Sequence, residues 1–359
     1  MKYKTKLLMG NVAISEGAII AGCRYYFGYP ITPQNEISEY MSRHIPAHGG
    51  AFIQSESELA AINMVLGAAA GGGRAMTTSS SPGISLMQEG ISYIAGMEIP
   101  CVIANVVRGG PGLGGIGPAQ SDYNQAVKGG GHGDYHTIVL APHSVQEMLD
   151  LTILAFDLAE KYRNPALILT DGLLGQTMET VEVPVDYKPK CYKKDWIMDG
   201  CKGRSPRLLR SLFLDPEELE NHNHHLAEKY RLIEKNECRY ESFRTRGMDI
   251  LLVAYGTSAR ISKAVVEMGR AEGIKLGLFR PITLYPFAEK VLRNLALRSK
   301  AVLVVELSMG QFLGDIKRII GDDSPIHFKG RTGGMVFSTE EVYLEVKKIA
   351  QRLKLVKKR

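Results

Sequence analysis

The sequence of 359 residues lacks a long hydrophobic run. A helix that crosses a lipid bilayer needs about 18 consecutive apolar residues, and no stretch of the chain approaches that length. Residues 1–22 begin with lysines and continue with apolar side chains, as a signal peptide does, but Asn11 and Glu16 interrupt the apolar stretch. We therefore expect a strand and a helix at this end, and a cytoplasmic protein that does not enter a membrane.

Cysteine is also scarce, and the chain contains only Cys23, Cys101, Cys191, Cys201 and Cys238. No two of them form a C-x-x-C pair, so we expect the chain itself to hold neither a zinc ion nor an iron–sulfur cluster. Cys23 and Cys101 have apolar neighbours, and we expect both in the hydrophobic core. His222, His224 and His225 lie among acidic residues, which indicates a solvated helix rather than a metal site.

The excess of positive charge is small. The net charge is +6, and basic residues gather at 347–359 without aromatic residues among them. Surfaces that bind single-stranded nucleic acid combine basic with aromatic side chains, so we expect no nucleic-acid partner. The basic residues at this end either form a solvated helix face or attract an acidic partner protein.

Two stretches of alternating strands and helices predict an α/β protein with two domains. The first covers residues 1–185 and the second, smaller one covers residues 247–359, while residues 186–246 connect them and contain a helix from Glu217 to about Lys235. Several predicted strands are almost continuously apolar, as buried parallel strands are. The predicted strands are 23–27, 75–79, 102–107, 137–140, 166–170, 250–254, 275–279, 301–306 and 325–328.

Ser55–Glu58 has the pattern of a capping box, which predicts a helix from here through Ala70. Glu58 then serves the cap, and Glu56 lies in the first helical turn with a free carboxylate. That carboxylate either stabilises the positive end of the helix or takes part in chemistry. A second capping box at Ser338–Glu341 predicts the last helix of the chain.

Gly28–Pro33 is a stiff segment because it contains two prolines three residues apart. Each proline fixes its own φ and keeps the preceding residue extended. Such a segment either presents the Thr32 hydroxyl to a ligand or begins a helix, with Thr32 as N-cap and Pro33 as the first helical residue. The residue pattern alone favours the helix cap.

Arg108 follows the predicted strand 102–107, at the strand end where ligands bind in open α/β sheets. Its guanidinium is either a surface charge or a bidentate grip on a carboxylate. Next, Gly112–Gly117 matches the dinucleotide pattern G-x-G-x-x-G, but Pro118 and Gly129–Gly131 leave no room for the helix that this pattern must open. We therefore expect a glycine-rich loop beside a site rather than a nucleotide site.

Together these motifs resemble the α subunit of 2-oxoacid:ferredoxin oxidoreductases. The segments that carry the resemblance are Gly28–Pro33, Gln54–Glu56, Ser79–Gly83, Arg108–Pro111, Val139–Pro142, Tyr255–Ser258 and Arg280–Pro286. The resemblance covers nearly the whole chain. It implies a thiamine-enzyme-type, pyrimidine-binding domain with a parallel sheet, followed by a smaller α/β domain similar to the transketolase C-terminal domain.

The resemblance also implies an activity. Such enzymes oxidatively decarboxylate a 2-oxoacid on thiamine diphosphate, pass electrons through iron–sulfur clusters to ferredoxin, and form an acyl-coenzyme A. Glu56 matches the glutamate that hydrogen-bonds the aminopyrimidine ring, with Pro30 and Ile31 also at the cofactor. Thr32 matches a threonine that faces the substrate, and Arg108 matches the arginine that binds the substrate carboxylate.

One motif of thiamine enzymes is missing. In them Gly-Asp-Gly, followed later by an asparagine, holds Mg²⁺ and the diphosphate; the nearest string here is Gly321–Asp323, and no asparagine follows it. We therefore expect a β subunit to supply the Mg²⁺ and diphosphate site. Iron–sulfur clusters are expected only in partner chains, including possible γ and δ subunits, with ferredoxin and coenzyme A as further partners. A non-catalytic scaffold subunit and half of a non-oxidative thiamine transferase are the alternatives.

The loop after Arg108 bears on the choice of substrate. Members that act on 2-oxoglutarate carry Leu-Pro-Thr there, whereas this loop reads Gly115–Tyr123 without a threonine. With Phe27 and Gln34–Glu36 around the first motif, the chain is more similar to the branched-chain type. The resemblance thus favours 3-methyl-2-oxobutanoate over 2-oxoglutarate.

Overall fold

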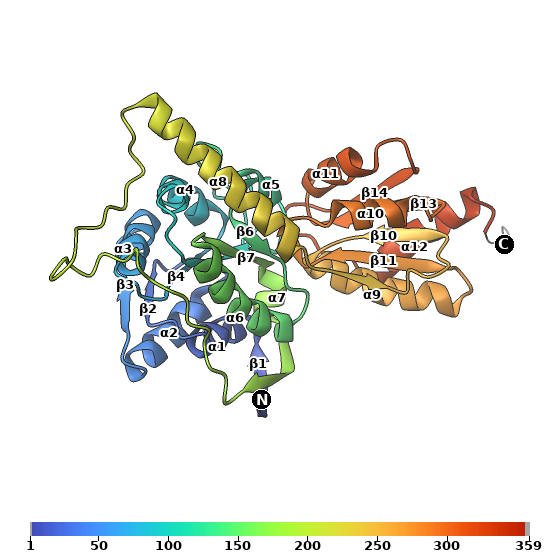
Figure 1. The fold of residues 1–359 in the computed structure, drawn as a ribbon. Helices are drawn as coiled ribbons and strands as arrows, with labels where there is room; N and C mark the ends of the chain where they lie inside the picture. The colour runs from blue at the N-terminus through green and yellow to red at the C-terminus, as the bar shows by residue number, and fades with distance from the viewer. Residues whose placement is uncertain (1, 356–359) are drawn as a thin grey trace.

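The computed structural model describes residues 2–355, so the basic residues at 357–359 lie outside it (Figure 1). Two open α/β sheets lie next to each other, and a small two-stranded sheet lies near the N-terminus. Within the described range, no helix is long and apolar enough to cross a membrane.

The first large sheet has seven strands in the order β12-β6-β7-β5-β4-β2-β3. Neighbouring strands are parallel except for β12, which pairs antiparallel with β6. The strands are β2 (Tyr25–Gly28), β3 (Ala51–Gln54), β4 (Ala75–Ser79), β5 (Val102–Val107), β6 (Ile138–Leu140), β7 (Ala166–Asp171) and β12 (Thr283–Tyr285). Strands β4 to β7 are buried along their whole length, as their sequences predict.

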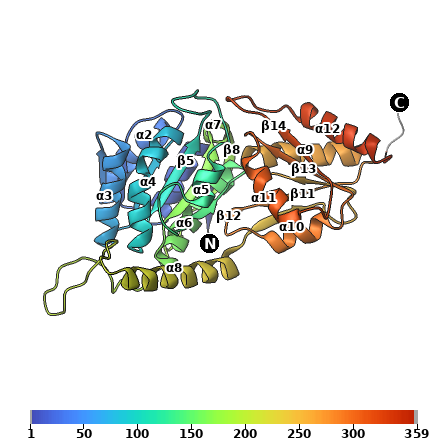
Figure 2. The same ribbon diagram turned by 90° about the horizontal axis from the view of Figure 1, so that it is seen from above.

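Helices cover both faces of this sheet (Figures 1 and 2). They are α1 (Gly10–Ile20), α2 (Asn35–Ala47), α3 (Glu58–Ala70), α4 (Ser81–Gly96), α5 (Tyr123–Lys128), α6 (Val145–Tyr162) and α7 (Gly172–Gln176). Because crossovers between parallel strands are right-handed, a reversal of direction along the sheet moves the connecting helix to the other face. Accordingly, α1 packs against α2 and α6 on one face, and α3 packs against α4 on the other.

The N-terminus forms the expected strand and helix. Strand β1 (Tyr3–Met9) pairs antiparallel with β8 (Met178–Pro184), and α1 follows directly. The residue patterns predicted no strand at β8.

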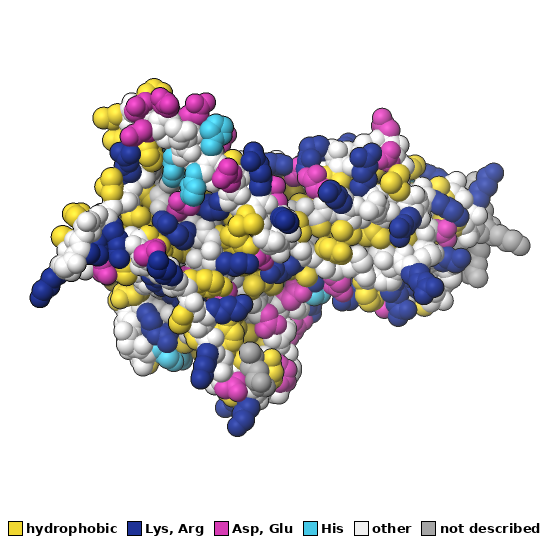
Figure 3. All heavy atoms as spheres, in the orientation of Figure 1, with side chains coloured by type: hydrophobic (Ala, Val, Ile, Leu, Met, Phe, Trp, Pro, Cys, Tyr) yellow, Lys and Arg dark blue, Asp and Glu magenta, His cyan; other side chains and the backbone are white. Residues whose placement is uncertain are grey.

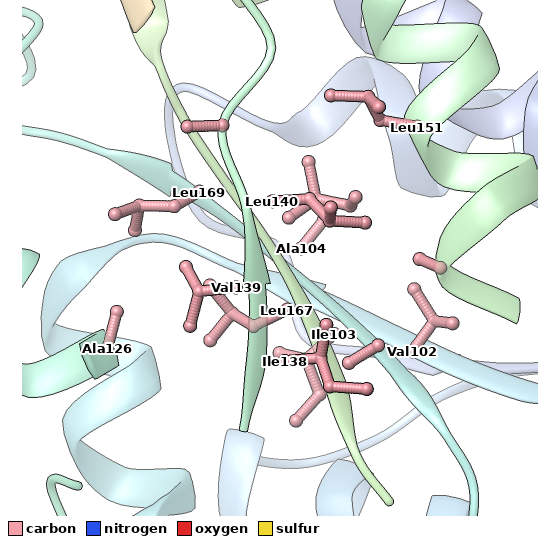
Figure 4. Close-up of a cluster of buried hydrophobic side chains, with 14 of the residues drawn as sticks. Val102, Ile103, Ala104, Ala126, Ile138, Val139, Leu140, Leu151, Leu167 and Leu169 are labelled. Carbon is pink, nitrogen blue, oxygen red and sulfur yellow. The ribbon is translucent and has the colours of Figure 1, made fainter. Parts of the chain in front are cut away.

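The core of the first domain lies between this sheet and its helices. Figure 4 shows side chains of β5, β6 and β7 between Ala126 of α5 on one side and Leu151 of α6 on the other, and all of them are buried. Cys23 and Cys101 are also fully buried, as predicted, and burial raises the pKa of each thiol to about 12.

Residues 186–215 form an extended connection along the surface and lead into α8 (Pro216–Glu237) (Figures 1 and 2). Arg74 and Glu160 of the first domain hold this connection, because Arg74 Nη2 donates to the carbonyl of Lys190 at 2.6 Å and Lys194 pairs with Glu160 at 2.6 Å. Hydrophobic side chains are exposed along it (Figure 3), with Leu214 88% exposed.

The second large sheet has five strands in the order β14-β13-β10-β11-β9. They are β9 (Tyr240–Phe243), β10 (Ile250–Val253), β11 (Leu276–Pro281), β13 (Ala301–Glu306) and β14 (Ile326–Gly330). Only β9 is antiparallel to its neighbour. The helices around this second sheet are α9 (Gly256–Ala271), α10 (Glu289–Ala296), α11 (Gln311–Ile320) and α12 (Thr339–Arg352). Ser338 and Glu341 form the capping box predicted for α12.

The two sheets are interlocked at their junction. Strand β12 comes from the second half of the chain but joins the first sheet, whereas β9 comes from the connecting segment and joins the second sheet. Buried Arg280 of β11 makes a bidentate ion pair with Glu147 of α6, at 2.7 and 2.9 Å. The domain boundaries at residues 185 and 246 stay predictions.

Candidate active site

The candidate residues lie at the carboxyl ends of β2, β3 and β5, which together with β4 are four adjacent parallel strands in the order β5-β4-β2-β3. In open α/β sheets this edge is where ligands bind. Thr32 follows β2, Glu56 follows β3, and Arg108 follows β5. The topology therefore brings all three predicted residues to one edge of the first sheet.

The segment after β2 is a turn, and it does not begin a helix at Thr32. Helix α2 starts only at Asn35, with Gln34 as its N-cap, so the interpretation of Thr32 as a helix cap was wrong. The Thr32–Pro33 peptide is cis, and the Thr32 side chain is exposed. Buried Gln34 holds the turn, because its Oε1 accepts from the Thr78 hydroxyl at 2.6 Å and its Nε2 donates to the Tyr29 carbonyl at 3.3 Å.

Glu56 lies outside the helix that follows it, and the expected capping box at Ser55 was wrong. The N-cap of α3 is Ser57, whose hydroxyl accepts from Ala60 N at 3.2 Å. The Ser55 hydroxyl instead donates to the Ser57 carbonyl at 2.9 Å, and its backbone N–H donates to the Gly28 carbonyl at 3.0 Å. These bonds tie the Glu56 loop to the end of β2 and leave the Glu56 carboxylate exposed, before the first turn rather than within it.

Glu58, expected to serve a cap, has a different place. Its carboxylate is buried and lies 3.4 Å from the Ser79 hydroxyl at the end of β4. Gly83 of α4 leaves the space for both groups, because a Cβ at this position would lie 2.0 Å from Ser79 Oγ and 2.3 Å from Glu58 Oε1. Of the two glutamates, only Glu56 therefore faces outward.

Arg108 is only 7% exposed, and its guanidinium bridges two loops. Nη1 donates to the Thr32 carbonyl at 3.0 Å and Nη2 donates to the Leu113 carbonyl at 3.1 Å. Its Nε is buried and has no hydrogen-bond partner. Each Nη carries two hydrogens, so several N–H groups of this guanidinium remain for an anionic ligand.

The backbone of Arg108 is held by a residue that the sequence reasoning missed. Ser81, at the start of α4, accepts a hydrogen bond from Arg108 N at 3.1 Å and donates one to Arg108 O at 3.2 Å. Ser81 belongs to the Ser79–Gly83 motif, but its residue type alone indicates only a helix start.

The segment that follows Arg108 is a closed glycine-rich loop. Gly109 N donates to Gly117 O at 2.9 Å, and Gly115 N donates to Gly109 O at 2.8 Å. The next helix, α5, begins only at Tyr123 and has six residues. The G-x-G-x-x-G pattern therefore lacks the helix N-terminus that binds a dinucleotide, in line with the prediction of a loop.

Two of the three histidines of α8, His222 and His225, contact neighbouring groups. His222 Nε2 lies 2.7 Å from the Gly96 carbonyl, and its ring stacks on Phe213. His225 pairs with Glu98 at 3.1 Å. Over residues 2–355, no group of three or more His, Cys, Asp or Glu side chains is arranged to hold a metal ion.

Two family models match the chain. The model described as pyruvate flavodoxin/ferredoxin oxidoreductase, thiamine diphosphate binding, matches residues 16–231. The model described as pyruvate:ferredoxin oxidoreductase core domain II matches residues 248–342.

Curated relatives match over almost the full length. Ketoisovalerate oxidoreductase subunit VorB of Methanothermobacter marburgensis is 50% identical over 349 residues, which cover 96% of this chain and 98% of the relative. The 2-oxoglutarate synthase subunit KorA of Methanocaldococcus jannaschii is 36% identical and covers 94% of this chain and 98% of its own length.

Solved structures agree with the fold. The 2-oxoglutarate:ferredoxin oxidoreductase of Magnetococcus marinus superposes with a TM-score of 0.86 at 28% identity, over 96% of this chain and 65% of that chain. A split-gene transketolase shares the fold at a TM-score of 0.57 and 14% identity. By its family models and its full-length relatives, the chain belongs to the 2-oxoacid:ferredoxin oxidoreductase subunits.

Proposed function

We propose that this chain forms the half of a thiamine diphosphate site that binds the 2-oxoacid. The observation that carries the proposal is the buried guanidinium of Arg108, which has an unpartnered Nε and touches the Thr32 segment at the ligand-binding edge of the sheet. A carboxylate that bridges guanidinium N–H groups gains about 1.5–3 kcal/mol from a charge-assisted contact. Arg108 thus binds the substrate carboxylate, and the exposed Thr32 hydroxyl faces the same substrate.

The residues of this chain fit the aminopyrimidine end of the cofactor. The Glu56 carboxylate is exposed at the same edge as Arg108, and the backbone of Pro30 and Ile31 belongs to the turn beside it. When bound, thiamine diphosphate would supply the electron sink that takes up the electron pair of the carbon–carbon bond to the carboxylate as carbon dioxide leaves. Glu56 would share a proton with a ring nitrogen of the bound cofactor through a hydrogen bond, and Pro30 and Ile31 would support the ring.

The rest of the site comes from partner chains in this proposal. The chain has no Gly-Asp-Gly motif followed by asparagine, and the described residues contain no cluster suited to a metal ion. We infer that a β subunit holds Mg²⁺ and the diphosphate. Partner chains, including γ and δ subunits where present, carry the iron–sulfur clusters that reduce ferredoxin, and coenzyme A accepts the acyl group.

The partner dependence has a direct test. Calorimetric titration of the isolated full chain with thiamine diphosphate and Mg²⁺ is expected to show weak or no binding, and the chain is expected not to turn over. Tight binding together with turnover by this chain alone would refute the divided site. Purification under anaerobic conditions is expected to bring a brown, cluster-containing partner with it, whereas a colourless active complex would favour the non-oxidative transferase.

We propose 3-methyl-2-oxobutanoate as the substrate in preference to 2-oxoglutarate. The loop that closes on Arg108 carries the exposed side chains of Leu113 and Ile116 and contains no lysine, no further arginine and no threonine between residues 109 and 118. An isopropyl group is suited to apolar surroundings, whereas a second carboxylate requires a cation or hydrogen-bond donors. The ketoisovalerate relative, at 50% identity, supports the same choice.

The substrate is tested by comparing kcat/KM for the two 2-oxoacids on the purified complex. A preference for 3-methyl-2-oxobutanoate of at least tenfold is expected. A strong preference for 2-oxoglutarate would refute the branched-chain assignment while leaving the proposed role of Arg108 in place.

A further inference from the structure

Asn105 forms hydrogen bonds to two segments near Arg108, the start of α4 and the residue before α5. It belongs to β5, three residues before Arg108, and is only 1% exposed. Its Oδ1 accepts a hydrogen bond from Ser81 N at 3.2 Å, and its Nδ2 donates to Asp122 Oδ2 at 2.8 Å. The amide is therefore used in both of its roles, once as acceptor and once as donor.

Ser81 connects Asn105 to Arg108 through hydrogen bonds. Its backbone N–H is held by Asn105, and its hydroxyl bonds both the N–H and the carbonyl of Arg108. The position of the Arg108 backbone thus depends on the place of Ser81 at the start of α4.

Asp122 completes the network at the far end of the glycine-rich loop. It is the N-cap residue of α5, and its carbonyl accepts from Ala126 N at 3.0 Å. Burial raises the pKa of its carboxyl, and the hydrogen bond from Asn105 opposes that rise. Asn105 therefore links the end of this loop to the residue with which the loop begins.

We propose that Asn105 is a positioning residue that sets the affinity of the site for the carboxylate of its 2-oxoacid, acting through Ser81 on Arg108. The inference rests on the proposed role of Arg108 in binding that carboxylate. A guanidinium that is displaced loses part of its charge-assisted contact with the carboxylate, so the affinity for that carboxylate falls. Only a side chain with one donor and one acceptor satisfies both Ser81 and Asp122, and an amide of this length has both.

The test is the exchange of donor and acceptor in the assembled complex. Asn105→Asp places a carboxylate oxygen against Asp122 at hydrogen-bond distance, and KM for 3-methyl-2-oxobutanoate is expected to rise at least tenfold while kcat changes less than threefold. Because one proton can bridge two carboxyl groups, the rise is expected to be smaller at pH 6 than at pH 8. The double variant Asn105→Asp with Asp122→Asn restores a donor and an acceptor, and its KM is expected within threefold of the wild type.

Asn164→Asp is the matched control. Asn164 is equally buried, and its Nδ2 donates to the carbonyls of His136 and Pro165 before the amino end of β7, away from the site. This variant is expected to lose stability without a change in KM. Should Asn105→Asp fail to fold, Asn105→Ser is the second variant, because a serine is too short to reach Ser81 N and Asp122 together and adds no charge, and the same rise in KM is expected.

A second readout does not require turnover. Amide hydrogen exchange on the full chain is expected to be faster at Arg108 in Asn105→Asp and to return to the wild-type rate in the double variant. A KM within twofold of the wild type in Asn105→Asp and Asn105→Ser, or a double variant that is not rescued, would overturn the positioning role. If the wild-type complex turns over no 2-oxoacid, the proposed function fails, and the exchange rates alone decide whether Asn105 holds Arg108.

Discussion

Arg108 is held in place by the protein before any ligand arrives. Two carbonyls, of Thr32 and Leu113, accept hydrogen bonds from different nitrogens of the same planar group. A guanidinium can make these bonds and still offer N–H groups to a carboxylate, whereas an ammonium is a single point of charge. The residue type therefore matters as much as its charge.

We expect Arg108→Lys to raise KM for the 2-oxoacid by about 10–100-fold, which corresponds to the loss of about 1.5–3 kcal/mol of charge-assisted binding. Steady-state kinetics of the complex measures this change. Arg43→Lys, on the exposed face of α2, is the control and is expected to leave KM unchanged. An unchanged KM in Arg108→Lys would show that Arg108 does not bind the substrate.

Glu56 is suited to a test of chemistry without loss of fold, because its side chain is exposed and precedes the helix. Removal of a positioned acid–base group costs a factor of about 10²–10⁴ in rate. We expect Glu56→Gln to lower kcat by at least 100-fold and to leave the melting temperature within a degree or two. Exposed Glu39→Gln serves as the control, and wild-type turnover in Glu56→Gln would favour the scaffold alternative.

At the scale of elements, the start of α4 packs unusually closely on the ends of β4 and α3. A Cβ at Gly83 would collide with Ser79 and Glu58, whereas a Cβ at Gly67 of α3 would have no atom within 4 Å. Overpacking typically costs about 1–3 kcal/mol, while alanine in place of an exposed helical glycine gains about 0.5–1 kcal/mol.

Gly83→Ala is therefore expected to destabilise the protein by about 1–3 kcal/mol and Gly67→Ala to stabilise it by up to about 1 kcal/mol. Urea unfolding of the two variants measures both changes. Equal stability of the two variants would show that α4 can move away from β4 at little cost.

Most buried strands of the two large sheets could be predicted from the sequence, even short ones such as β6 and β10, whereas strands that depend on distant partners could not. Residues 75–79, 102–107 and 301–306 were predicted with the bounds of β4, β5 and β13, because short stretches of mostly apolar or β-branched residues favour buried strands. Strands β9 and β12 have four and three residues, and only their partners in the folded chain make them strands.

The sequence could predict that the candidate residues lie at one edge of the sheet, but it could not predict their contacts. The motifs pointed to Thr32, Glu56 and Arg108, and the strand order brings them to one edge. The contact between Arg108 and Thr32 uses a backbone carbonyl, which any residue type would supply, so no residue pattern could reveal it. Likewise, Ser55 and Ser57 are equally good N-caps by residue type. Only the backbone course of the folded chain, which enters α3 at Glu58, makes Ser57 the N-cap.

At the scale of the whole molecule, the ion pair of Glu147 and Arg280 links the two halves. Burial alone would raise the pKa of Glu147, but the hydrogen bond from His143 and the charge of Arg280 lower it from 4.5 to about 2. A carboxyl with a lowered pKa in the folded state contributes its full stability above pH 4.5, and that contribution is lost as the pH falls toward 2.

The lowered pKa corresponds to about 3 kcal/mol of unfolding free energy. We expect Glu147→Gln to be less stable at pH 6 and to lose less stability than the wild type between pH 5 and pH 3. Urea unfolding across this range measures both slopes. Glu267→Gln is the control, because Glu267 belongs to an exposed ion pair with Arg244. If the unfolding free energies of Glu147→Gln and wild type changed with pH in parallel, the lowered pKa of Glu147 would be contradicted.

Strand β12 has a consequence for how this chain can be divided. It is the outermost strand of the first sheet, although it lies some 140 residues beyond its partner β6 in the chain, at Thr283–Tyr285 against Val139–Leu140. A cut between the two halves, whether by a protease or by splitting the gene, would strip that strand away and leave the hydrogen-bonding groups of buried, apolar β6 open to other chains. Fragments made in this way are expected to aggregate, so we expect the two halves to fold correctly only as one polypeptide.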